Sequence, residues 1–194
     1  MCGLVGMAGN IFLHNHGKMF RDMLVFDAVR GLDSTGIALV DLVTGSVPHI
    51  VKSVGGPTEL FELQTNTLTC DRGFPKVQTM CLLGHNRAAT TGKITDENAH
   101  PFKFGEITGA HNGSLTDWTD LEGYKEFDVD SKAIFYTISK KGIDHCWKSF
   151  RGPAALTFWN NKELSINLIE IMGALCSMLG MKRKMYCFGL QRLG

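Results

Sequence analysis

The second residue of the chain is a cysteine, followed by an apolar, glycine-rich stretch, so that residues 2–6 read CGLVG. If Met1 is removed, the Cys2 thiol and the free α-amino group belong to the same residue. An α-amino group titrates at about 7.7–8.0 and a thiol at about 8.5, so the amine can accept the thiol proton directly or through one water. The thiolate is the nucleophilic form of cysteine. This placement predicts an N-terminal nucleophile.

Five further polar clusters interrupt apolar or glycine-rich stretches of the chain. Each has an ordinary structural interpretation when taken alone, because Asn-Gly suits a turn, Arg-Gly-Leu-Asp a helix end and His-Pro a proline turn. Their co-occurrence is what indicates a functional site. In order, they are RGLDSTG from Arg30, GHNRAATTG from Gly84, NAHPF from Asn98, GAHNGSL from Gly109 and VDSKAI from Val129.

Taken together, these motifs resemble the glutaminase domain of the class II glutamine amidotransferases, which are N-terminal nucleophile hydrolases. Family members carry CGIVG, YRGYDSAGIA, GHTRWATHG, NAHPH, HNGII and DTE in this order. The chain has CGLVG, VRGLDSTGIA, GHNRAATTG, NAHPF, HNGSL and DSK, and the match covers roughly residues 2–169. Ala88 stands where many members have tryptophan, and Ser114 and Leu115 replace two aliphatic residues. These differences concern the substrate lid more than the reaction class.

The resemblance implies a role for each matched residue. Cys2 is the expected nucleophile, and the Asn112 side-chain amide and the Gly113 backbone N–H are the expected oxyanion hole. Arg87 is expected to bind the α-carboxylate of glutamine, because a planar guanidinium suits a carboxylate, and Asp130 its α-ammonium group. Further residues implied at the site are Arg30, in a supporting catalytic role, and Thr90 and His100, lining the substrate pocket.

The implied activity is the glutaminase half-reaction, in which the thiolate attacks the side-chain amide of L-glutamine, ammonia leaves, and water hydrolyses the thioester to glutamate. Two alternatives stay open. One is an N-terminal-cysteine amidase acting on acyl amides, which does not need Arg87 and Asp130. The other is a catalytically silent domain of the same fold, which the presence of Cys2 and Asn112 disfavours. For His100 a structural loop role is the alternative, and we interpret His85 and His111 as structural.

Composition narrows the function classes. The chain has 194 residues, 44% of them hydrophobic, and a net charge of +1, which predicts one domain and no nucleic-acid partner. It lacks an apolar run of about 18 residues, so no membrane span is expected. It also lacks a signal-peptide pattern, which favours the cytoplasm. None of its six cysteines has metal-ligand spacing, so neither a metal nor another cofactor is expected.

The periodicity of apolar residues predicts strands and helices that alternate as hairpins, without β-α-β units. This pattern favours an α+β fold, and the family resemblance implies a four-layer α/β/β/α sandwich of antiparallel sheets. The expected elements are a strand at 3–12, a helix at 17–31 ending at Gly31, a hairpin at 36–54, a short helix at 57–65, strands running into loops at 78–92 and 105–117, a helix at 130–150 and a hairpin at 152–169.

The end of the chain departs from the family pattern. Residues 1–169 are expected to form the glutamine amidotransferase domain, whereas residues 170–194 are rich in Met and Cys without strand alternation. Back-translated one base out of frame, this tail can read IRNNGSTLFYAWNEKKNVLFWASETW, with an arginine, two aromatic strands and a terminal ASE, as in the family. We therefore expect a frameshift near Ile169–Glu170 and a tail that lacks the closing strands; a divergent or amphipathic C-terminal helix is the alternative.

No synthase domain follows residue 169 in the sequence, although the family's glutaminase domain usually supplies ammonia to one. Two arrangements are therefore expected: a stand-alone glutaminase, or a subunit that passes ammonia to a separate synthase subunit. The ammonia acceptor is not encoded in any motif of the chain.

Overall fold

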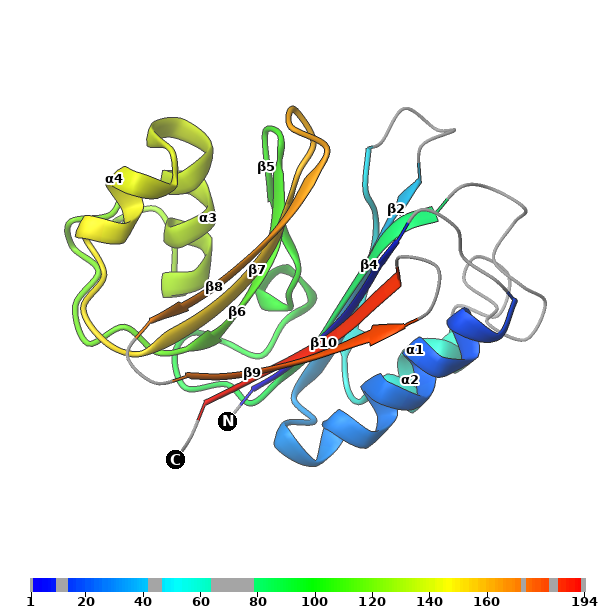
Figure 1. The fold of residues 1–194 in the computed structure, drawn as a ribbon. Helices are drawn as coiled ribbons and strands as arrows, with labels where there is room; N and C mark the ends of the chain where they lie inside the picture. Colours follow the sequence, from blue (N-terminus) through cyan, green and yellow to red (C-terminus); the bar gives the residue numbers. More distant parts are fainter. Residues whose placement is uncertain are drawn as a thin grey trace.

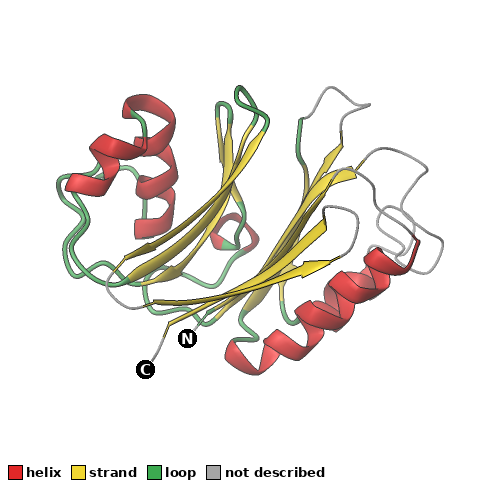
Figure 2. Cartoon of the chain, in the orientation of Figure 1, coloured by secondary structure: helices red, strands yellow, loops and turns green. Residues whose placement is uncertain are grey.

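The computed structural model describes residues 2–9, 14–41, 47–63, 79–171, 174–181 and 185–192. Within these residues, two antiparallel sheets face each other and helices cover the outer face of each (Figures 1 and 2). Helices α1 (His14–Asp27) and α2 (Pro57–Leu63) lie on one sheet. Helix α3 (Asp130–Lys141), with α4 (Ile143–Lys148) packed against it, lies on the other. The α+β sandwich with layers α/β/β/α, expected from the sequence, is confirmed.

The sheet beneath α1 has six strands in the order β3-β2-β4-β1-β10-β9. Its register brings distant motifs to one end, because Gly3 of β1 pairs with Asn86 of β4 and Ser34 of β2 pairs with Arg87. The residues around Cys2, Asp33 and Arg87 therefore meet at a single edge. The strands are β1 (Gly3–Gly9), β2 (Ser34–Asp41), β3 (His49–Val54), β4 (Thr79–Arg87), β9 (Ala174–Met181) and β10 (Met185–Arg192).

The sheet beneath α3 has four strands in the order β5-β6-β7-β8. The hairpin predicted at 152–169 is confirmed as β7 and β8, and the strand predicted at 105–117 as β6, whereas β5 was not anticipated. Residue Gly113, at the end of β6, pairs with Ala154 at the start of β7. The strands are β5 (Phe102–Phe104), β6 (Ile107–Gly113), β7 (Ala154–Asn160) and β8 (Ser165–Ile171).

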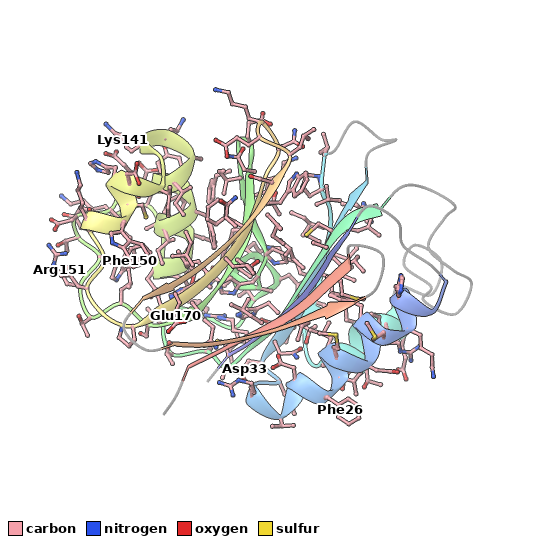
Figure 3. All side chains as sticks on the ribbon, viewed as in Figure 1. Phe26, Asp33, Lys141, Phe150, Arg151 and Glu170 are labelled. Carbon is pink, nitrogen blue, oxygen red and sulfur yellow. The ribbon has the colours of Figure 1, made fainter. Side chains whose placement is uncertain are left out.

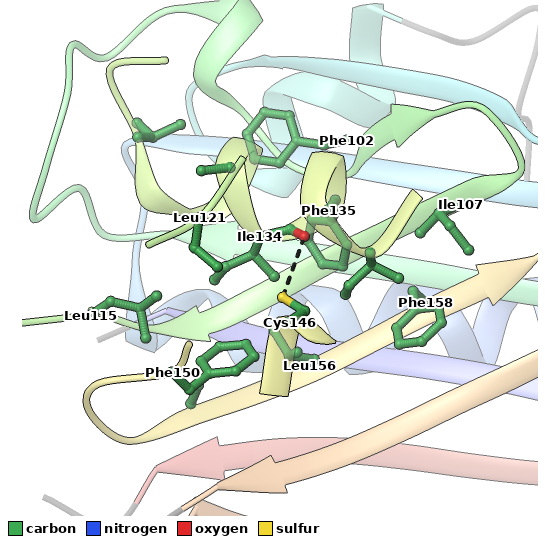
Figure 4. Close-up of a cluster of buried hydrophobic side chains, with 14 residues drawn as sticks. Phe102, Ile107, Leu115, Leu121, Ile134, Phe135, Cys146, Phe150, Leu156 and Phe158 are labelled. Atoms are coloured by element: carbon green, nitrogen blue, oxygen red, sulfur yellow. Dashed lines mark hydrogen bonds between the residues drawn. The ribbon is translucent and has the colours of Figure 1, made fainter. Parts of the chain in front are cut away.

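Small residues allow close packing at two interfaces, the one between the two sheets and the one between α3 and its sheet. Between the sheets, Leu4 packs against Ala110 and Ala155. Beneath α3, the rings of Phe135 and Phe158 meet edge-on with centroids 6.5 Å apart (Figure 4). A Cβ at Gly109 would collide with the Phe135 ring and lie 2.6 Å from the Phe158 Cβ. Glycine at this point of β6 therefore lets the helix contact the sheet.

One predicted helix ends at a glycine as expected, and another is interrupted by a glycine. The helix expected at 17–31 is α1 followed by a 3₁₀ turn, η1 (Ala28–Arg30), and ends at Gly31 as predicted. The single helix expected at 130–150 is wrong, because the chain breaks between α3 and α4 at Gly142, where φ is +81°. That left-handed conformation costs glycine little and ends the hydrogen-bond ladder. The hairpin expected at 36–54 is confirmed as β2 and β3, and its turn lies outside the described residues.

The backbone of the C-terminal segment differs from the sequence-based expectation. We expected residues 170–194 to lack the closing strands, yet β9 and β10 form a hairpin and β10 pairs with β1. Strand pairing uses main-chain groups that every residue except proline carries, so it can occur without side-chain alternation. The frameshift itself concerns the gene and stays a prediction.

Candidate active site

A small pocket opens where the ends of β1, β4 and β6 meet the first turn of α3. Six of the residues predicted at the site line this pocket: Cys2, Arg87, Thr90, His100, Gly113 and Asp130. Segments that are separated by up to 128 positions in the sequence thus form one wall. The other lining residues, which sequence reasoning did not assign to the pocket, are Ala88, Thr91, His111, Val129 and Ser131.

The Cys2 side chain is held against the start of the loop that follows β4. Its Sγ–H donates to the Ala88 carbonyl oxygen and its Sγ accepts from the Ala88 N–H, both at 3.4 Å. The Arg30 Nε donates to the Cys2 carbonyl oxygen at 3.0 Å. Burial raises the pKa of the Cys2 thiol, and the hydrogen bond with Ala88 only partly offsets this. At neutral pH the group is therefore a thiol, which needs a base before it can attack.

Arg87 is almost fully buried at the end of β4 and is tied to the same loop. Its Nη1 donates to the Lys93 carbonyl oxygen at 3.0 Å and its Nη2 to the Thr91 carbonyl oxygen at 2.6 Å. The loop is also bound by the residue that precedes β2, since the Ala89 N–H donates to the Asp33 Oδ2 at 2.7 Å. The guanidinium therefore both lines the pocket and supports its rim.

Asp130 adds a carboxylate to the same pocket, with a charge opposite to that of the Arg87 guanidinium. Its Oδ2 accepts from the Leu115 N–H at 2.9 Å, and its Oδ1 accepts from the Ser131 N–H at 2.8 Å. These bonds tie the first residue of α3 to the segment that leaves β6. A pocket lined by a guanidinium and a carboxylate is suited to a zwitterionic amino acid.

The two residues predicted as the oxyanion hole lie in sequence at the end of β6. Gly113 lines the pocket, and a Cβ there would lie 2.6 Å from both the His111 Nε2 and the Pro153 carbonyl oxygen, so the close packing excludes a side chain. Asn112 is buried but does not line the pocket in this state. Arg30 likewise does not line the pocket, and it contacts the Cys2 carbonyl oxygen.

Three buried histidines stand behind the pocket. The rings of His85 and His100 are tilted by 33° with centroids 4.0 Å apart. His85 Nε2 lies 3.1 Å from the His111 carbonyl oxygen, and His111 Nδ1 lies 3.0 Å from the Ser131 Oγ. Burial lowers the pKa of all three, for His85 to about 3. They are therefore neutral near pH 7. His100 and His111 also line the pocket, a place that sequence reasoning had not given His111.

The cavity volume is about 20 Å³, which admits a single water. An amino-acid substrate would require the rim to move. Within the described residues, no group of three or more His, Cys, Asp or Glu is placed to bind a metal ion. None of the helices in the described part of the chain has the length and apolar character that a bilayer crossing requires.

Comparison with curated proteins identifies relatives that match part of their length. Glutamine–fructose-6-phosphate aminotransferase (isomerizing) of Streptococcus pneumoniae is 33% identical over 124 residues, covering 63% of this chain and 18% of that protein. The Aquifex aeolicus enzyme of the same name is 30% identical over 164 residues, covering 72% and 23%. Amidophosphoribosyltransferase of Archaeoglobus fulgidus is 31% identical over 157 residues, covering 72% and 30%. The chain thus matches less than a third of each relative.

The fold is also similar to a solved structure. Glutamine phosphoribosylpyrophosphate amidotransferase from B. subtilis, complexed with ADP and GMP, superposes with a TM-score of 0.70 over 97% of this chain and 41% of that chain. The sequence identity is 22%, so this likeness concerns the fold. No protein-family model matches the chain.

Proposed function

Because the chain belongs to the class II glutamine amidotransferases, a family of N-terminal nucleophile hydrolases, we propose that it catalyses the glutaminase half-reaction at the pocket around Cys2. The observation that carries this proposal is the meeting of Cys2, Arg87 and Asp130 in one pocket. Hydrolysis of the side-chain amide of a free amino acid requires a nucleophile for the amide carbon, a cation for the α-carboxylate and an anion for the α-ammonium group.

The proposed first step is proton transfer from the Cys2 thiol. Removal of Met1 frees the α-amino group, which accepts this proton directly or through one water, and the raised pKa of the thiol is the reason that a base is needed. The thiolate then attacks the side-chain amide carbon of glutamine, and negative charge develops on the amide oxygen. The Gly113 backbone N–H and the Asn112 side-chain amide stabilise this charge. One such donor typically contributes about 2.7–4 kcal/mol.

Collapse of the tetrahedral intermediate breaks the carbon–nitrogen bond. The protonated α-amino group returns its proton to the leaving nitrogen, so that ammonia departs and a thioester with Cys2 remains. Water, deprotonated by the same amine, attacks the thioester through a second oxyanion. Glutamate and the free thiol are the products, and the amine is ready for another turnover.

Substrate recognition is proposed to use the two charged residues of the pocket. Arg87 binds the α-carboxylate as a planar fork, and Asp130 binds the α-ammonium group. Because the cavity has a volume of only about 20 Å³, glutamine enters when the loop held by Arg87 moves away. The substrate carboxylate then competes with the Thr91 and Lys93 carbonyl oxygens for the guanidinium.

The fate of the ammonia is a separate part of the proposal. The relatives are three or more times longer than the region that they share with this chain. We propose that the ammonia passes to a synthase domain or subunit; release to solvent by a stand-alone glutaminase is the alternative. Assaying glutaminase activity with and without candidate acceptor enzymes distinguishes the two.

The proposal is tested with purified protein and its Cys2→Ala variant. Intact-mass spectrometry is expected to show that Met1 is removed, and glutamate release from glutamine is expected for the parent protein and absent for the variant. The electrophilic glutamine analogue 6-diazo-5-oxo-norleucine is expected to label Cys2, and the buried Cys81 and Cys146 serve as internal controls. Full activity in a protein that retains Met1 would refute the mechanism. Hydrolysis of N-acyl amides in preference to glutamine would favour the amidase alternative.

A further inference from the structure

We propose that Asp27 is a positioning residue for the N-terminal nucleophile, because its carboxylate occupies the side-chain space of position 3 and, together with Arg30, holds the Cys2–Gly3 segment from the side of α1. The proposal rests on the proposed function, which makes Cys2 the nucleophile. Asp27 is the last residue of α1 and does not line the substrate pocket.

Strand alternation decides which way position 3 faces. Successive residues of β1 point to opposite faces of the sheet. Leu4 lies between the two sheets with Ala110, whereas Val5 packs on the other face with Phe20 of α1. Position 3 therefore faces α1, like Val5.

The carboxylate of Asp27 fills the space that a side chain at position 3 would need. A Cβ added to Gly3 would collide with Asp27 Oδ2 and lie 2.5 Å from Oδ1. The carboxylate thus lies directly against the Gly3 backbone, one residue from the nucleophile. Glycine at this position is required by the contact, in addition to any effect on substrate approach.

A hydrogen-bonded network fixes the carboxylate in this place. Asn86 Nδ2 donates to Asp27 Oδ2 at 3.2 Å and to the Leu24 carbonyl oxygen at 2.8 Å. Asn86 Oδ1 accepts from Thr35 Oγ1 at 3.1 Å. Since Asn86 pairs with Gly3 in the sheet, the strand that neighbours β1 also holds the group that supports Gly3.

The Cys2–Gly3 segment is contacted by two side chains of opposite charge, those of Asp27 and Arg30. Arg30 lies three residues after Asp27, and its Nε donates to the Cys2 carbonyl oxygen at 3.0 Å. Burial raises the pKa of Asp27, while the hydrogen bond from Asn86 and the charge of Arg30 lower it. A partly buried carboxylate lowers the stability of the protein. The Asp27 carboxylate lies where the proposed nucleophile, Cys2, must be held in a fixed position.

The test compares Asp27→Asn and Asp27→Ala with Asp22→Ala, an exposed aspartate of the same helix. Asp27→Asn keeps the shape and can still accept from Asn86, so it addresses the case in which Asp27→Ala does not fold. We expect kcat for glutamine hydrolysis to fall at least tenfold in both Asp27 variants, with KM changed less than threefold and Asp22→Ala unchanged. Substitution of a residue with a merely structural role would change the fraction of folded protein without lowering the kcat of the folded protein.

Two further measurements separate this proposal from the proposed function. The rate at which iodoacetamide alkylates Cys2 needs no glutamine turnover, and we expect it to change at least threefold in Asp27→Asn. Gly3→Ala is expected to lower kcat and the melting temperature, and Gly3→Ala/Asp27→Ala to recover the melting temperature of Asp27→Ala, since the collision is then removed. A folded Asp27→Asn protein with parental kcat and alkylation rate would overturn the proposal, whatever the fate of the glutaminase assignment.

Discussion

The sulfur of Cys2 lies 3.4 Å from both the backbone nitrogen and the backbone oxygen of Ala88, the residue that directly follows Arg87. The proposed nucleophile and the proposed carboxylate-binding residue therefore share one piece of backbone. Antiparallel pairing of β1 with β4 produces this relationship, because Gly3 pairs with Asn86. A change at Arg87 can thus affect both substrate binding and the position of the Cys2 thiol. Measurement of KM and kcat can separate these two effects.

Arg87→Lys is expected to raise KM for glutamine at least tenfold while kcat changes less than threefold. A lysine offers a point charge in place of a planar fork, and it cannot hold the Thr91 and Lys93 carbonyl oxygens together. Initial rates as a function of glutamine concentration measure both constants. If kcat fell and KM stayed constant, Arg87 would be acting on the thiol through Ala88 and not on the substrate.

Asn112→Ala is expected to lower kcat about 10²–10³-fold with little change in KM. The amide is proposed to donate to charge that develops only in the transition state, and loss of one such donor has an effect of this size. Because Asn112 is buried, the melting temperature is measured alongside. Asn161→Ala, at the turn between β7 and β8, is the matched control. An effect confined to KM would contradict the oxyanion-hole assignment.

Stability is expected to fall steeply as the pH drops below about 6.5. Burial lowers the pKa of His85 to about 3, and it also lowers the pKa of His100 and His111. In this range the unfolded state binds protons that the folded state does not, so the free energy of unfolding decreases as the pH falls. Three such groups together contribute up to about 4 kcal/mol per pH unit. Urea unfolding at pH 5, 6 and 7 measures the slope, and a flat profile would mean that these histidines are charged or exposed.

Phe135→Ala is expected to lower the free energy of unfolding by about 3–5 kcal/mol, because a fully buried ring is replaced by a cavity between α3 and β6 (Figure 4). The matched control is Phe26→Ala, on the outer face of α1 (Figure 3), where 80% of the side chain is exposed. Urea unfolding is expected to show little change for the control. Equal effects of the two substitutions would indicate that α3 does not pack as described.

Resequencing of the gene is expected to find a single-base insertion or deletion near the codons for Ile169 and Glu170. The reason is the out-of-frame sequence, in which an arginine, two aromatic stretches and a terminal ASE stand where the family pattern has them, whereas the residues as written are rich in Met and Cys. Restoring the frame is expected to increase soluble yield. A proteolytic peptide whose mass matches residues 163–182 as written, obtained from the native source, would contradict the frameshift.

The sequence alone determined the motifs of the pocket and most of the local structure. The hairpins at 36–54 and 152–169 could be predicted because alternation and turn residues lie within a few positions of one another. Lining residues such as Arg87 and Asp130 could be identified because their motifs resemble those of the family, and Cys2 because of its place next to the N-terminus. The break at Gly142 was missed, since a glycine within a helical pattern does not by itself show whether the helix continues.

Only the tertiary structure decided which of these groups touch. The contact of Asp27 with Gly3 spans 24 positions, and that of Cys2 with Ala88 spans 86. The contact between the His85 and His100 rings likewise depends on how the loop after β4 folds back. Periodicity describes which face of an element is apolar, but it contains no information on which strands become neighbours. Sheet register and the packing of α1 supply that information, and they place a carboxylate behind the nucleophile where no motif had indicated one.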